Sequence, residues 1–159
     1  MSAVPHAATI NAARESLLSL HKALIDDLRA AHERATGRPL TPGELLGLLT
    51  GDAEFDWLHP FSQLIVAIDE LLEREVPPSD ADAAAVRLEI ARLIDGREPR
   101  YTAASDRATS VALEHGRLQA TLERLPDSSL DEQPSLLKCR AGWNGPKRKR
   151  TLGKKQSPE

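Results

Sequence analysis

A chain of 159 residues predicts one domain with a single hydrophobic core. Apolar residues make up 40% of the chain and charged residues 28%, but aromatic residues only 3%, a mixture that favours helices over sheet. The longest apolar run, Leu64 to Ile68, is far too short to cross a bilayer, and the first residues lack the pattern of a secretory signal. A single cysteine, Cys139, excludes an internal disulfide. We therefore expect a cytoplasmic protein with no membrane partner.

The net charge of −3 conceals an uneven distribution along the chain. Residues 1–137 contain 13 Lys and Arg against 23 Asp and Glu, whereas residues 138–159 contain 8 against 1. A shift in composition of this kind marks a boundary between regions. We expect a flexible N-terminus over residues 1–9, a helical bundle domain over residues 10–125 and a disordered basic tail over residues 126–159.

The first half of the predicted bundle contains one long and one short helix. Apolar residues recur at steps of three and four from Ile10 to Ala35, which predicts an amphipathic helix of about seven turns that ends near Gly37. Start signals follow at once, because Thr41 can cap a helix and Glu44 completes a capping box. We expect a short helix over residues 42–49.

The second half is predicted to contain three longer helices. Asp52 can cap a further turn, and Pro60 should keep His59 out of the helical region, so that the chain breaks there. Apolar stripes and stop signals then predict helices over residues 60–75, 79–95 and 102–125. No stretch alternates with a period of two. The predicted fold class is all-α, a compact bundle of four long helices plus one or two short helices.

The stretch from Phe55 to Glu70, FDWLHPFSQLIVAIDE, resembles the core of a family of short, uncharacterised bacterial proteins. The shared pattern is F-x-W-L-x-P-x-S-x-L-I-V-x-I-D-E, and the similarity covers roughly residues 13–125, including His115. This chain departs from the family at His59, where arginine is expected, and in a shorter link before the last helix. The resemblance implies a compact helical fold in the bacterial cytoplasm and supplies no activity.

The polar residues contain no catalytic signature. The five histidines do not occur at the spacings of a helical metal site, so only a convergence of His21, His59 and His115 from three helices would build one. The competing interpretation places these histidines at the core edge or on the surface. Neighbouring carboxylates lie on the predicted solvent faces, and Cys139 has no sequence partner. We predict no enzymatic activity and no catalytic, cofactor-binding or metal-binding residue.

The function we predict is a non-enzymatic protein-interaction or accessory module, whose partner is an unknown protein or a second copy of the chain. The candidate interaction surface consists of Phe55, Trp57 and His59, which lie together beside the predicted break. An apolar patch left exposed around Trp57 would support this surface, and burial of Trp57 would remove it.

The alternative is a nucleic-acid-associated protein that binds through its basic tail. Cations there would bind a polyanion with strong salt dependence, and an aromatic residue would stack on a base. The candidate polyanion-binding residues are Trp143, Lys147, Arg148, Lys149, Arg150, Lys154 and Lys155. Two further interpretations stay open: a tail that docks weakly on the acidic bundle or has no role, and a terminus replaced through a frameshift.

Overall fold

The computed structural model describes residues 5–144, and every regular element in that range is a helix. The α-helices are α1 (His6–Thr36), α2 (Pro42–Gly51), α3 (His59–Glu73), α4 (Asp80–Ile94), α5 (Pro99–Arg107), α6 (Thr109–Leu122) and α7 (Gln133–Ala141). Three 3-10 turns, η1 (Ala53–Leu58), η2 (Leu130–Glu132) and η3 (Gly142–Asn144), complete the set. The predicted all-α fold is confirmed. None of these helices combines the length and the apolar character that a membrane crossing requires.

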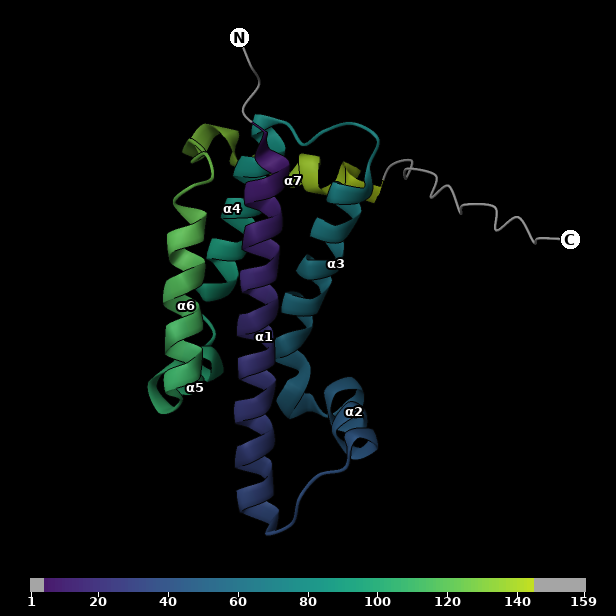
Figure 1. Cartoon of the computed structure of the whole chain (residues 1–159), viewed down its shortest axis with the longest axis vertical. Helices are drawn as coiled ribbons and strands as arrows, with labels where there is room; N and C mark the ends of the chain where they lie inside the picture. The colour runs from purple at the N-terminus through teal and green to yellow at the C-terminus, as the bar shows by residue number, and fades with distance from the viewer. Residues whose placement is uncertain (1–4, 145–159) are drawn as a thin grey trace, which may run out of the picture.

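The longest helix, α1, runs through the middle of the bundle, with α3 on one side and α6 on the other (Figure 1). It begins at His6, so residues 6–9 are helical and the flexible N-terminus predicted for them is wrong. Its buried stripe has the predicted spacing and comprises Ile10, Ala13, Leu17, Leu20, Ala23 and Leu24. The helix ends at Gly37, whose φ of 72° is a left-handed conformation that glycine adopts without steric cost.

The chain breaks at Asp52, whose backbone is extended (φ −94°, ψ 129°), and the break predicted at His59 and Pro60 is wrong. The Asp52 carboxylate accepts the Glu54 N–H at 2.8 Å and so caps η1. His59 has φ −56° and ψ −42°, inside the helical region, so the expectation that Pro60 excludes it from the helix is wrong. Pro60 lies in the first turn of α3, where a backbone N–H has no partner within the helix, so its missing donor costs nothing. The residue before a proline prefers an extended backbone, but at His59 the packing of the turn outweighs this preference.

The helix predicted over residues 102–125 is divided in two. Ala108 has φ −114° and ψ 115°, an extended conformation that ends α5 and begins α6. Ser105, Asp106 and Thr109 flank it, and such residues are weak helix formers because their side chains compete for backbone hydrogen bonds. The Arg107 guanidinium also donates twice to Asp27 of α1, at 3.2 and 2.5 Å, which ties the end of α5 to the bundle. Two helices, α5 and α6, therefore stand where one helix over residues 102–125 was predicted.

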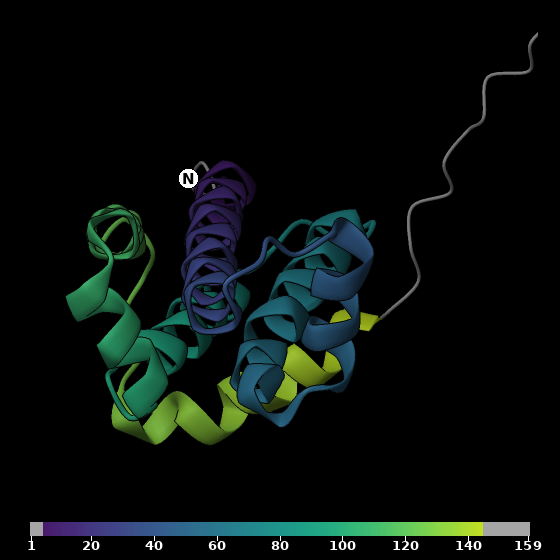
Figure 2. The ribbon, with the colours of Figure 1, turned by 90° about the horizontal axis from the view of Figure 1, so that it is seen from below.

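Residues 126–144, which we call the C-terminal strap, fold onto the bundle. Ser129 and Glu132 form a capping box at η2, and α7 then runs across α4 to η3, which packs against α3 (Figure 2). Leu136 is 4% exposed and Trp143 is completely buried. The prediction that the bundle stops at residue 125 and that a disordered tail begins there is therefore wrong for the strap. The rest of that tail, residues 145–159, lies outside the described residues.

Candidate functional surfaces

The predicted interaction surface around Trp57 is buried in an aromatic cluster centred on Phe61. The ring centroid of Phe61 lies 6.2 Å from that of Trp57, 6.3 Å from that of His21 and 6.0 Å from that of Tyr101. Phe55 is 2% exposed and Trp57 is 8% exposed, so the exposed patch predicted there is wrong. The turn in η1 folds both side chains back toward the core, where they remove a large apolar area from water.

The third residue of that surface, His59, is half-buried and supports α2. Its ring Nε2 lies 2.9 Å from the carbonyl oxygen of Leu49, one of the last carbonyls of α2. Such carbonyls have no partner within their own helix, so a side-chain donor satisfies one of them. His59 therefore attaches the end of α2 to α3 and is not available as part of a contact surface for a partner.

The histidines do not assemble a metal site. His21 and His115 lie on either side of the Phe61 and Tyr101 rings, and His59 faces α2. Within residues 5–144 no group of three or more His, Cys, Asp and Glu side chains is arranged to hold a metal ion. The convergence of His21, His59 and His115 that the sequence left open does not occur.

Tyr101 and His115 form a hydrogen bond inside the bundle. The Tyr101 hydroxyl lies 2.5 Å from Nδ1 of His115. Burial raises the pKa of Tyr101 and lowers the pKa of His115, so both the phenol and the imidazole are held in their neutral forms. Burial lowers the pKa of His21 in the same way. The pair suits a neutral hydrogen bond that orients two rings, because both shifts oppose a proton transfer.

Trp143 is held by Asp82 and is not available to stack on a base. Its indole N–H donates to the Asp82 carboxylate at 3.1 Å, inside the seam between the C-terminal strap and α4. Asp82 also completes the Ser79 capping box and pairs with Arg74 at 2.8 Å. Burial alone would raise the pKa of Asp82, but the hydrogen bonds from Ser79 and Trp143 and the charge of Arg74 outweigh it and lower the pKa. The predicted role of Trp143 in binding a polyanion is therefore wrong.

The remaining candidates for polyanion binding are outside the part of the chain that the structure describes. These are Lys147, Arg148, Lys149, Arg150, Lys154 and Lys155. The last described residue, Asn144, directly follows the buried Trp143. A start signal for the strap is present in the sequence, where Ser129 and Glu132 have the spacing of a capping box and Pro134 follows.

The helix α2 has an uncovered surface that the sequence analysis missed. Four of its ten residues are leucine, yet none of its residues is buried. Leu46 is 61% exposed, whereas Leu48 and Leu49 are half-buried and touch the core. Gly43, Gly47 and Gly51 recur at every fourth position and share the face opposite the core contacts. A Cβ atom at any of the three would meet no heavy atom within 4 Å, so this face is open.

Both ends of α2 are held firmly. The Thr41 side chain accepts the Glu44 N–H at 3.2 Å, which confirms the predicted cap. The Glu44 carboxylate pairs with Arg38 at 3.3 Å and does not complete the predicted capping box. The preceding Leu40 is buried; its N–H donates to Glu33 at 2.9 Å and its carbonyl accepts from Arg29 at 3.1 Å. At the other end, the Asp52 N–H donates to the carbonyl of Leu48 at 3.0 Å. The α2 helix is thus fixed in place without being covered.

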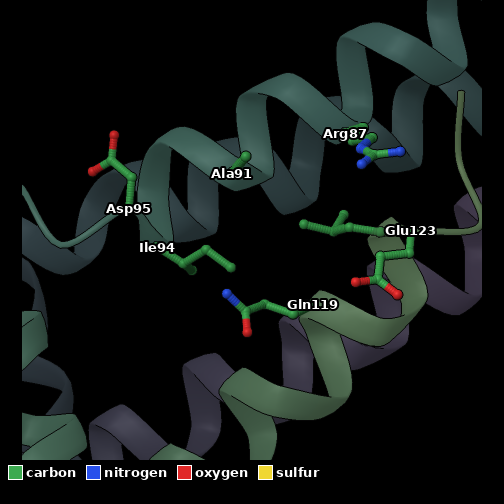
Figure 3. A pocket seen from close by; sticks show the side chains of 7 residues that line it. Arg87, Ala91, Ile94, Asp95, Gln119 and Glu123 are labelled. Carbon is green, nitrogen blue, oxygen red and sulfur yellow. The ribbon is translucent and has the colours of Figure 1, made fainter. Parts of the chain in front are cut away.

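A pocket of about 410 Å³ lies between α4 and α6. Figure 3 shows Arg87 and Glu123 toward one end, while Ile94 and Gln119 approach each other from opposite helices. Arg87 is already engaged, because it donates to the carbonyl of Leu125 at 2.7 Å and so holds the chain that follows α6. The lining residues include no hydroxyl, thiol, amine or imidazole, and of the two carboxylates present, Asp95 and Glu123, Asp95 pairs with Arg97 at 2.9 Å. We assign no reaction to this pocket.

Comparison with known protein families, curated proteins and solved structures finds no match to this chain.

Proposed function

We propose that this chain is a non-enzymatic protein-interaction module whose contact surface is α2. The observation that carries the proposal is that a leucine-rich helix of ten residues has no buried residue. Burying an exposed leucine side chain contributes roughly 1.5–3 kcal/mol, so the sequence leaves part of this free energy unused within its own fold. A second protein that covers α2 would gain it.

The fixed position of α2 supports the same proposal. The buried Leu40 attaches the start of the helix to Glu33 of α1, and the His59 contact attaches its end to α3. A surface that is already ordered loses little conformational entropy when a partner binds, which improves affinity for a given contact area. Interface backbones in such pre-organised complexes move little on binding. The helix therefore suits recognition of a partner without rearrangement.

Site-specific photocrosslinking of the full chain tests this proposal. A photoreactive side chain at Thr50, which is exposed on α2, should form a discrete adduct in cells or with purified partner. Leu46→Lys in the same helix should abolish the adduct, because it places a charge in the apolar contact. A photoreactive side chain at Leu113, a 57% exposed leucine on α6, is the matched control. An adduct that survives Leu46→Lys, or appears equally from position 113, would overturn the proposal.

A second candidate function is polyanion binding by the basic tail. Residues 147–155 contain six Lys and Arg, a density that binds nucleic acid through release of counterions. Since Trp143 is buried, we propose that this binding is purely electrostatic, with a slope of log K against log salt of at most roughly −5 on duplex DNA. The full chain and a chain that ends after Asn144, which keeps every described element, are compared at two salt concentrations. Equal affinities would refute this candidate.

A further inference from the structure

We propose that the occupant of α2 is a second copy of this chain, packed antiparallel to α2 across Gly47. This inference rests on the proposed function and names its partner. An antiparallel pair of identical helices is related by a two-fold axis, so each contact that one copy makes is repeated by the other. The helix must then carry both a projecting group and a place that receives it.

The two groups are Leu46 and the face at Gly47. Leu46 projects from the bundle with 61% of its surface exposed, and it lies at the border of the glycine face. At Gly43 and Gly47 the helix has no side chain, and nothing else in the fold fills the space, since an added Cβ would find no atom within 4 Å. A leucine from a facing helix fits over such a glycine, and the missing side chains let the two backbones approach closely. Leu46 of each copy would therefore pack over Gly47 of the other.

The charges at the two ends of α2 favour the antiparallel direction. Arg38 lies before the helix and is 67% exposed, although it touches Glu44. Glu54 and Asp56 follow the helix; both are exposed, and neither has an ion pair within residues 5–144. Both carboxylates lie in η1, directly after the C-terminal end of α2. Antiparallel pairing across Gly47 brings them toward Arg38 and the positive helix end of the second copy, whereas a parallel pair would bring like charges together.

The size of the contact sets the strength of the dimer. One ten-residue helix against another, with the ends of the neighbouring loops, is smaller than the interfaces of stable dimers. We therefore expect a reversible dimer with a dissociation constant on the order of 10 μM or weaker. It is detected by sedimentation equilibrium of the full chain over micromolar to millimolar concentrations.

Two substitutions test the geometry, each with a matched control in α6. Gly47→Gln fits the open space, improves helix propensity and blocks the close approach, so it should raise the monomer's stability and weaken the dimer at least tenfold. Gly116→Gln is also open and also in a helix, and it should leave the dimer unchanged. Leu46→Ala should weaken the dimer, while Leu113→Ala should not.

The direction of pairing is tested by charge exchange. Arg38→Glu should weaken the dimer, and combination with Glu54→Arg and Asp56→Arg should restore it, since the opposite charges then face each other again. A chain that stays monomeric up to millimolar concentration overturns the inference, as does a dimer indifferent to Gly47→Gln. If the chain is monomeric while the Thr50 crosslink to another protein persists and depends on Leu46, the second copy is refuted and the proposed function of α2 stands.

Discussion

The α2 helix and the C-terminal strap differ in how far they are buried, and the difference is the opposite of what their compositions suggest. The α2 helix is among the most apolar segments of the chain, yet none of its residues is buried. The strap precedes a basic segment and has a polar sequence, yet it contributes the fully buried Trp143 and the buried Leu136. Local composition thus predicts that a helix forms, but burial is decided by partners far along the chain, such as Asp82 for Trp143.

The strap is held by buried carboxylates as well as by apolar contacts. Asp82 and Glu89 are 7% and 8% exposed, and each receives a group from the strap: the Trp143 indole N–H on Asp82 and the Arg140 guanidinium on Glu89. Both carboxylates also have a partner within the bundle, Arg74 and Arg92 respectively. Loss of the strap would therefore weaken these networks without leaving either charge alone.

Removing the strap's anchor gives the largest expected effect. Trp143→Ala should lower the free energy of unfolding by about 3–5 kcal/mol, because it removes a fully buried aromatic side chain and leaves a cavity. Urea unfolding followed by circular dichroism measures this loss. A loss below about 1 kcal/mol would mean that the strap is not part of the cooperative fold, and the strap would then be no more firmly packed than α2.

The same substitution at a second strap position gives the next largest effect. Leu136→Ala should lower the free energy of unfolding by about 2–4 kcal/mol, since Leu136 is 4% exposed in the seam against α4. The measurement is again the urea midpoint at constant slope. A neutral result would contradict the seam described between α7 and α4.

A pH titration separates the strap from the aromatic cluster. Burial lowers the pKa of His21 and His115 below their ordinary 6.5, so the unfolded chain takes up protons before the folded one, and stability should fall as the pH drops below 6.5. This loss should be smaller than that caused by Leu136→Ala. Asp82 has a lowered pKa, so its contribution persists at and above its ordinary 3.8 and is lost as the pH falls through its lower folded-state pKa.

The urea midpoint as a function of pH should therefore fall in two separate steps. His21→Gln combined with His115→Gln should remove the upper step and leave the lower one. An unchanged upper step in this double variant would show that other groups cause it.

The smallest effect is expected in α2. Leu46→Ala should change the free energy of unfolding by no more than about 0.5 kcal/mol, because a 61% exposed side chain loses little contact. It is the matched partner of Leu136→Ala, with the same atoms removed from the opposite region. Equal losses for the two, measured at a concentration where the chain is monomeric, would erase the contrast between α2 and the strap.

The features that the sequence predicts correctly depend on neighbours within a few residues. The α1 stripe and the caps at Thr41 and Asp52 are all of this kind. Next to the break at Ala108, Arg107 is attached to Asp27, 80 residues away, a contact that the local sequence does not reveal. The burial of Trp57 and the docking of Trp143 also depend on surfaces assembled from several helices. Periodicity marks a buried face, but it does not identify what covers that face.

The two tryptophans are the only ones in the chain, and their positions make the protein its own spectroscopic probe. Trp57 lies just before α3 begins, while Trp143 sits beside Asp82, which pairs with Arg74 immediately after α3 ends. Both indoles are buried, so each should emit at short wavelength when its surroundings are folded. Replacing either one by phenylalanine leaves a single emitter at one end of α3. The two variants can then tell whether the α2 end and the strap end melt together or in sequence.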